Sequence, residues 1–331
     1  MLPFILLVAC AVAIYLSCEG FVNAVEWLGQ RLAVGPLAVG TILAAIGTAL
    51  PESVVTLVAA VFGRTGAQKD IGVGAAMGGP LALATIAYGV TGVVLLIHRR
   101  TRPADLGPTR KLARDQTWFL TIFVVKVALG LVAFALKPWL GLLFFAAYGV
   151  YFWRELRDDS DHGTGEGALG GELGPLLLQR RRPVPATWAI AVQTLVTLGV
   201  IFVASQLFVD QLDAIGPMLG LPAAVTALLL SPIATELPET MNAIIWVRQG
   251  KTPLALANIS GAMMIQATVP SGIGLLATPW RFDGALVSAG LTTMIAIGYL
   301  LLLLRRGRLT GLTLAWATAF YAAFAVSLAF V

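Results

Sequence analysis

Apolar runs of about twenty residues recur from one end of the chain to the other, with short polar stretches between them. A run of this length can cross the hydrocarbon core of a bilayer as a helix. We identify ten candidate spans, at residues 2–18, 34–61, 71–97, 117–136, 138–154, 186–209, 217–247, 253–278, 284–304 and 310–330. The alternation typical of a transmembrane β-barrel is absent. The pattern predicts an all-α integral membrane protein with ten transmembrane helices.

The composition agrees with a bilayer as the main solvent. Of 331 residues, 58% are hydrophobic and 12% are charged, whereas a soluble chain has about 25% charged residues. Most arginines and lysines fall on loops that face the cytoplasm if the N-terminus lies outside, which is the positive-inside pattern. We therefore expect a multi-pass protein of the cell membrane with both termini extracytoplasmic. Its net charge of +5 then sets orientation in the lipid bilayer and does not indicate a nucleic-acid partner.

The first run admits a second interpretation as a secretory signal peptide. It lacks the basic region that such peptides carry at their start, and it has a counterpart later in the chain, so we expect it to be a span. Cys10 and Cys18 lie on this run and give no disulfide framework.

The two halves of the chain resemble each other. The string GTALPE begins at Gly47 and the string ATELPE begins at Ala234, and the shift that superimposes them also aligns their flanks. We expect a first repeat at residues 1–156, a cytoplasmic linker at 157–185 and a second repeat at 186–331. Five spans in each half would insert the second repeat upside down, as in many secondary transporters. The linker is rich in Gly, Asp and Glu, which predicts a segment without regular structure.

The repeated string places helix-breaking residues at membrane depth. Pro51 and Pro238 have no N–H and disrupt the preceding helical turn. The carbonyl groups near 45–48 and 232–235 would then lack helical partners. In lipid such groups must line a polar cavity or contact a bound ion.

The same strings supply oxygen ligands. A glutamate follows each proline, at Glu52 and Glu239, and a threonine precedes it, at Thr48 and Thr235. Carboxylates, hydroxyls and carbonyls are the ligands that hard cations such as Ca²⁺ take. An ionisable residue inside a membrane indicates function by default. The two strings therefore predict two half-sites that together bind a cation, with Glu52 and Glu239 as the metal ligands.

These strings resemble the α-repeats of the sodium/calcium exchanger family, in the cation/Ca²⁺ antiporter superfamily, which read Gly-Thr-Ser-Leu-Pro-Glu. The resemblance covers nearly the whole chain. It implies alternating access, with Ca²⁺ moved against Na⁺ or H⁺, inorganic cations as the only substrates and no cofactor. The ligands that it implies are Thr48, Glu52, Thr235 and Glu239, with the carbonyl groups near Ala45 and Pro232.

The sequence departs from the family pattern where flanking monovalent ions would bind. Glu236 replaces a serine, and the stretch GAAMGGPLAL from Gly74 lacks the expected polar residues. In the second half, ANISGAMMIQ from Ala257 keeps only Asn258 and Gln266 as candidate ligands. The transported ion and the counter-ion are therefore open. A divergent proton-coupled exchanger of a monovalent or another divalent cation is the alternative, and a passive cation channel is the weaker one.

Glu236 suggests how protons would enter the cycle. Together with Glu52 and Glu239 it would bring three carboxylates into one cavity, and like charges that close cannot all be ionised. Loading a cation would then expel a proton. Lys126, central in the fourth span, offers a competing balance of charge, because a lysine there pairs with an acid or faces a cavity. Glu19, near the inner end of the first span, is a candidate for an ion entry path.

An intramembrane enzyme is not supported. Zinc proteases need paired histidines, and the two histidines, His98 and His162, lie in loops between the apolar runs. No nucleophile elbow or phosphate-binding loop is present. We therefore expect a transporter and not an enzyme, and its oligomeric state is open.

Overall fold

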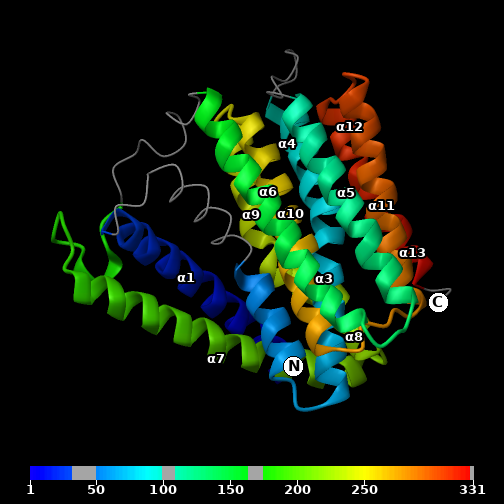
Figure 1. Ribbon diagram of the computed structural model, residues 1–331, viewed down its shortest axis with the longest axis horizontal. Coiled ribbons are helices and arrows are strands. Elements are labelled where there is room, and N and C mark those ends of the chain that lie inside the picture. The colour runs from blue at the N-terminus through cyan, green and yellow to red at the C-terminus, as the bar shows by residue number, and fades with distance from the viewer. Residues whose placement is uncertain (32–49, 99–108, 163–173, 329–331) are drawn as a thin grey trace.

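The computed structural model describes residues 1–31, 50–98, 109–162 and 174–328, and every regular element in these ranges is a helix (Figure 1). The α-helices are α1 (Leu2–Arg31), α3 (Gly66–Ala82), α4 (Tyr88–His98), α5 (Thr109–Leu131), α6 (Gly141–His162), α7 (Thr187–Leu219), α8 (Ala223–Thr235), α9 (Leu237–Arg248), α10 (Thr252–Ala277), α11 (Gly284–Arg305), α12 (Gly311–Ala315) and α13 (Ala317–Ser327). Another apolar helix covers Leu50–Val61. A π-helical turn, Leu83–Ala87, joins α3 to α4, and 3₁₀ turns lie at Lys137–Leu140 and Leu177–Gln179. The all-α class is confirmed for the described residues.

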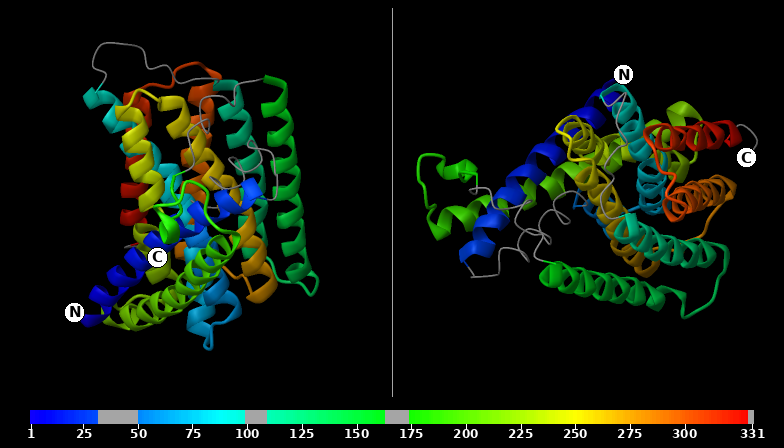
Figure 2. Two further views of the ribbon diagram at one scale, coloured as in Figure 1. Left: turned by 90° about the vertical axis from the view of Figure 1, so that its left-hand side faces the viewer. Right: turned by 90° about the horizontal axis from the view of Figure 1, so that it is seen from above.

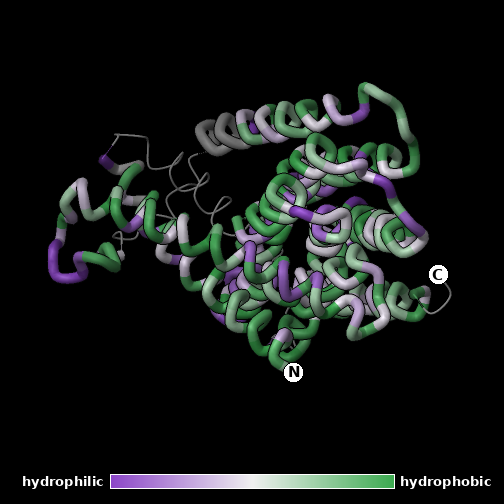
Figure 3. Tube along the Cα trace, turned by 90° about the horizontal axis from the view of Figure 1, so that it is seen from below, coloured by the Kyte–Doolittle hydropathy of each residue, from purple (hydrophilic) through white to green (hydrophobic). Residues whose placement is uncertain are grey.

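Five of the described helices are long and apolar enough to cross a membrane. They cover Leu2–Val25, Gly66–His98, Thr187–Leu219, Thr252–Ala277 and Gly284–Arg305. Three shorter apolar helices cover Leu50–Val61, Ala223–Thr235 and Gly311–Ser327. Figure 3 shows most of the helical trace in hydrophobic colours. The count of ten spans and the inverted arrangement of the two halves stay predictions.

The helices form one bundle and one slanting pair. α1 packs along α7, and this pair leans away from the other helices (Figures 1 and 2). Inside the bundle, α3 packs on α8, α6 on α10, α12 on α4 and α5 on α11. Helices that are distant in sequence therefore meet in pairs, and each of these pairs joins one helix of the first half to one of the second.

The contact between α3 and α8 depends on two glycines. A Cβ atom on Gly74 would lie 2.0 Å from the carbonyl oxygen of Ala224, and one on Gly78 would lie 2.5 Å from that of Leu228. Small residues one turn apart allow two helix backbones to approach closely in a membrane. This close approach brings the end of α8, where the second repeated string begins, against α3.

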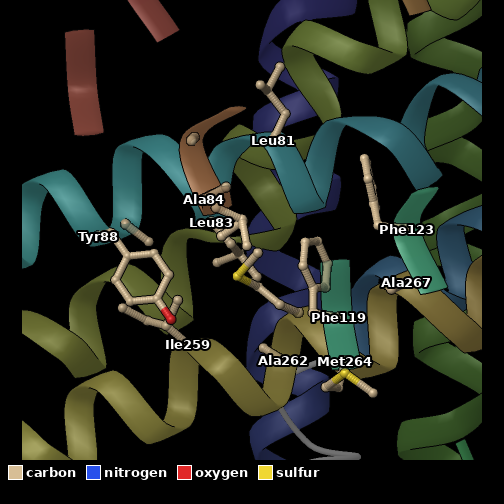
Figure 4. Packing of buried hydrophobic residues seen from close by; sticks show 14 of the residues in the cluster. Leu81, Leu83, Ala84, Tyr88, Phe119, Phe123, Ile259, Ala262, Met264 and Ala267 are labelled. Atoms are coloured by element: carbon tan, nitrogen blue, oxygen red, sulfur yellow. The ribbon is translucent and has the colours of Figure 1, made fainter. Parts of the chain in front are cut away.

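The largest hydrophobic cluster lies between α3, α4, α5 and α10 (Figure 4). Phe119 and Phe123 of α5 stack with 5.1 Å between their ring centroids. Met264 and Ala267 of α10 belong to the same cluster and are fully buried. This packing holds α5 against α10.

The predicted linker contains more structure than its composition suggested. Residues 157–162 continue α6 as far as His162, and Leu176 is fully buried. The indole Nε1 of Trp27 in α1 donates a hydrogen bond to the carbonyl oxygen of Gly174, at 2.9 Å. The expectation of a segment without regular structure was therefore wrong at the start of 157–185, where α6 continues, and near its end, where Leu176 packs against α1 and α7. Residues 163–173 lie outside the described residues.

Candidate cation-binding site

The structure buries the second repeated string together with the acid of the first. Glu52 lies in the first turn of the helix Leu50–Val61, Thr235 ends α8, and Glu239 lies in the first turn of α9. Glu236 joins α8 to α9, and Gln266 lies in α10. None of these five side chains exposes more than 3% of its surface. The first string's Thr48 and Ala45 lie outside the described residues.

The α8–α9 junction carries the break expected at the second proline. Pro238 cannot donate to the carbonyl of Ala234, and α8 ends at Thr235 while α9 begins at Leu237. One expectation is wrong. The carbonyl oxygen of Pro232 is not without a helical partner, because the N–H of Glu236 donates to it at 2.9 Å. Glu236 keeps nearly helical dihedral angles, φ −99° and ψ −2°, so the break opens later than the sequence suggested.

Thr235 joins the two halves of the site. Its hydroxyl lies 2.8 Å from Oε2 of Glu52 and 2.8 Å from Oε1 of Glu236. The same hydroxyl lies 3.2 Å from the carbonyl oxygen of Ser231. Two glutamates that are far apart in sequence thus meet through one threonine, as the pairing of the two strings predicted.

Gln266 completes the cluster from α10, in space that α3 leaves open. Its Nε2 donates to Oε2 of Glu236 at 2.8 Å. A Cβ atom on Gly79 of α3 would lie only 2.7 Å from Oε1 of Gln266 and 3.1 Å from Oε1 of Glu236. A larger residue at position 79 would therefore force the side chains of Gln266 and Glu236 to shift. A departure from the family pattern on α3 accommodates another on the α8–α9 junction.

Several buried oxygen atoms of the cluster have no hydrogen-bond partner among the described residues. They are Oε1 of Glu52, Oε1 and Oε2 of Glu239, Oε1 of Gln266 and Oγ of Ser231. Buried polar atoms without partners are costly, so this set is suited to a cation. Among the described residues, no three Asp, Glu, His or Cys side chains converge closely enough to hold a metal ion. Any cation here would need ligands besides carboxylates.

Two predicted residues are not brought to the cluster. Asn258 lies eight residues before Gln266 on α10, about 12 Å along the helix axis, and its side-chain amide donates to none of the acids among the described residues. Glu19 is exposed on α1 and accepts a hydrogen bond from the hydroxyl of Tyr15, at 2.6 Å. The structure therefore gives Glu19 a local partner, and its role as an entry path stays a prediction.

Lys126 lies beside the cluster, and its side chain contacts a backbone carbonyl that the sequence analysis did not name. It is completely buried on α5, and its Nζ donates to the carbonyl oxygen of Ala76 on α3, at 2.6 Å. Lys126 and Glu52 are close enough to attract each other electrostatically. The signal was available, because Pro80 lies four residues after Ala76 and leaves that carbonyl without its helical donor.

The family of the chain follows from three comparisons with known proteins. The model of the sodium/calcium exchanger protein family matches residues 2–156 and 189–331. The inner membrane protein YrbG of Escherichia coli (strain K12) is 26% identical over 304 residues, which cover 91% of this chain and 87% of that protein. The putative antiporter CaxA of Alkalimonas amylolytica is 24% identical over 303 residues, covering 88% of this chain and 87% of that protein.

Solved structures share the fold. A crystal structure of the H⁺/Ca²⁺ exchanger CAX gives a TM-score of 0.72 at 15% identity and covers 99% of this chain and 82% of that one. A structure of the sodium-calcium exchanger NCX_Mj gives 0.58 at 19% identity, with 98% of each chain covered. The family match extends over both repeated strings and most of the residues between them. The chain belongs to the sodium/calcium exchanger protein family.

Proposed function

We propose that this membrane protein is a secondary active antiporter that moves Ca²⁺ in exchange for protons by alternating access. Membership of the exchanger family supports a Ca²⁺ antiporter. The choice of counter-ion comes from the buried cluster and not from the relatives. Na⁺ is the second candidate, since one of the similar structures is a sodium-calcium exchanger.

Ca²⁺ suits the oxygen atoms that the cluster offers. It takes about six to eight oxygen ligands in flexible geometry, with carboxylates, carbonyls and amides mixed. Glu52 and Glu239 would supply charged ligands from opposite halves, and Gln266 an amide oxygen. Thr235, with Thr48 and the carbonyl groups near Ala45 and Pro232, would complete the shell. This mixed set is consistent with the lack of a three-acid metal cluster among the described residues.

The observation that carries proton exchange is the position of the Thr235 hydroxyl. A hydroxyl has one proton to donate, yet this one lies 2.8 Å from an oxygen of each of two carboxyl groups. Only one of the two contacts can use the threonine proton. The other is a hydrogen bond only if a carboxylic acid donates to the threonine oxygen. We infer from this arrangement that Glu52 or Glu236 carries an acidic proton when no cation is bound.

Loading of Ca²⁺ would displace that proton. A divalent ion on Glu52 and Glu239 favours the ionised form of every carboxyl group near it. The proton would leave as the cation enters, and the reverse would release the cation on the other side. For Na⁺, the first half offers few ligands, because Ala75, Gly79 and Leu83 have neither hydroxyl nor amide groups.

The test is Ca²⁺ uptake into proteoliposomes against an imposed pH gradient, with no Na⁺ present. We expect the gradient to drive uptake by the wild type. The variant Glu236→Ser should still pass Ca²⁺ down its own gradient but lose most of its response to pH. Glu19→Ser, which removes an exposed glutamate, is the matched control and should respond like the wild type. Uptake that ignores the pH gradient but follows a Na⁺ gradient would replace the proton by Na⁺.

A further inference from the structure

The carbonyl group of Ala76 lacks the partner that a helix normally provides. α3 continues through Pro80, which has no N–H to donate to the residue four positions earlier. Inside a membrane, an unpaired carbonyl must contact another polar group or a cation. The same proline rule predicts the cation ligands in the two repeated strings. The carbonyl oxygen of Ala76 is thus a further candidate ligand for a cation, in the middle of a buried helix.

The ammonium of Lys126 satisfies this carbonyl. Its Nζ lies 2.6 Å from the carbonyl oxygen, 5.1 Å from the ring centre of Phe123 and 5.9 Å from that of Trp280. Figure 4 shows Phe123 beside α3. A carbonyl oxygen and aromatic faces together are ligands for a monovalent cation, and their attraction is strongest when the site excludes water. Lys126 exposes none of its surface.

Trp280 is held in place at a conformational cost. Its φ of 47° lies in the left-handed region, which is unfavourable for a bulky residue and persists only where surrounding contacts enforce it. Its Nε1 donates to the carbonyl oxygen of Lys126 at 3.3 Å, and its own carbonyl oxygen accepts from Nζ of Lys137 at 2.8 Å. Its backbone N–H donates to Oγ1 of Thr278. These hydrogen bonds therefore fix the indole ring of Trp280 beside the Lys126 ammonium.

This position lies next to the acid cluster. Ala76 is one turn before Gly79, whose neighbours are Gln266 and Glu236, and Lys126 attracts Glu52. Glu52, Glu236 and Glu239 do not converge on one point, but they lie within electrostatic reach of one another. If all three were ionised, their charge would exceed that of one divalent ion by one. A fixed ammonium supplies that missing charge, so the cavity is neutral when a divalent cation is bound. Without Lys126, a free monovalent cation or a retained proton would have to supply it.

We propose that Ala76, Phe123 and Trp280 form a monovalent-cation position that the Lys126 ammonium occupies. Lys126 is then a specificity-determining residue, because it removes the need for a free monovalent ion during Ca²⁺ transport. The inference rests on the proposed Ca²⁺ transport but is independent of the counter-ion. It predicts that an empty position will accept a small cation from solution.

The experiment is tracer exchange of Ca²⁺ across proteoliposomes with equal pH and equal Ca²⁺ on both sides. N-methyl-D-glucamine is the only other cation until ammonium, K⁺ or Na⁺ is added to both sides. Lys126→Ala, which leaves a space, should exchange at least about tenfold more slowly than wild type, because the buried carboxylates lose a counter-charge. Ammonium should restore the rate several-fold. Lys126→Met, which fills the space, should be equally slow and should not recover.

Lys251 provides the control. It is an exposed lysine directly before α10, and it precedes Gln266 by about 22 Å of helix. Lys251→Ala should exchange Ca²⁺ like the wild type and show no response to ammonium. If Lys126→Ala is too unstable for transport assays, its unfolding temperature in detergent is measured instead, and it should rise on addition of ammonium while that of wild type does not.

Each outcome separates this inference from the proposed function. If wild type exchanges Ca²⁺ and Lys126→Ala exchanges it equally fast without any monovalent cation, the inference is wrong. The proposed Ca²⁺ transport is then unaffected. A slow but folded Lys126→Ala that none of the three cations accelerates shows that Lys126 is structural only. Failure of the wild type to exchange Ca²⁺ at all contradicts the proposed function itself.

Discussion

The two helices that cross the site, α3 and α10, solve the same problem differently. In each helix, one buried carbonyl group lacks its usual N–H donor because the residue four positions later is a proline. That proline is Pro80 in α3 and Pro270 in α10. On α3 the carbonyl oxygen of Ala76 accepts from the ammonium of Lys126 at 2.6 Å. On α10 the carbonyl oxygen of Gln266 meets the hydroxyl of Ser271 in the same helix, at 3.4 Å. One half uses a charge from another helix, and the other uses a neutral neighbour.

The difference shows how related halves can acquire different chemistry. α10 presents an amide to the cavity, whereas α3 presents glycine and alanine and relies on α5 for a polar group. The extra negative charge of Glu236 and the positive charge of Lys126 are both departures that the repeat does not predict. Their signs are opposite, so each is tolerable in a buried cavity when the other is present.

The largest expected effect tests what the two halves still share. Glu52→Gln and Glu239→Gln should each lower Ca²⁺ transport about a hundredfold or more, since loss of a buried charged partner costs about 3 kcal/mol or more. Ca²⁺ uptake by purified variants in proteoliposomes is the measurement. Glu19→Gln, which changes an exposed glutamate of the same chain, should keep nearly full activity. Robust uptake by either buried variant would show that the halves are not equivalent ligands.

A smaller effect tests whether the small residue Gly79 on α3 makes room for the larger Glu236 at the α8–α9 junction. Gly79→Ser should destabilise the protein by about 1–3 kcal/mol, because its Cβ would overlap Oε1 of Gln266 and crowd Glu236. The double variant with Glu236→Ser should recover much of this loss, because the smaller partner leaves Gln266 free to move. Thermal unfolding of the purified proteins gives the coupling energy.

Gly298 of α11 is the control for that cycle. A Cβ there meets no atom within 4 Å, so Gly298→Ser should change the free energy of unfolding by less than about 0.5 kcal/mol. If Gly79→Ser is equally harmless, or if its cost does not depend on Glu236, the two departures are unrelated and the comparison of the helices loses its basis.

Much of this architecture was readable from the sequence. Apolar runs predicted an all-α membrane protein, and the paired strings predicted that Glu52 would meet the second half, which the Thr235 hydroxyl confirms. Family membership confirms the prediction of a transporter and not an enzyme. The predictions of a membrane protein and of a buried site at Glu52 rest on local rules, namely the length needed to span lipid and the cost of a buried carboxylate.

The rest depended on contacts between helices that no local rule supplies. The sequence placed Lys126 at membrane depth, and Pro80 marked the carbonyl of Ala76 as unpaired. That the two groups meet depends on how α5 and α3 are arranged in the fold. It suggested an unpaired carbonyl at Pro232, but the backbone stays helical enough for Glu236 to donate to it. Asn258 has a ligand's chemistry but lies two turns from Gln266 along α10. Position in the fold, and not residue type, decided these three cases.

The smallest expected effect tests the neutral half of the comparison. Ser271→Ala removes the hydroxyl that donates to the carbonyl oxygen of Gln266, and Pro270 prevents the backbone from replacing it. Because the bond is long and uncharged, we expect a loss of only about 0.5–1.5 kcal/mol in unfolding free energy. We expect Ca²⁺ exchange within about twofold of wild type, because the substitution removes no charged ligand of the cation. Thermal unfolding and tracer exchange measure the two quantities on the same sample. A loss of exchange as large as that of Lys126→Ala, or its recovery by ammonium, would show that α10 also depends on a cation at its freed carbonyl.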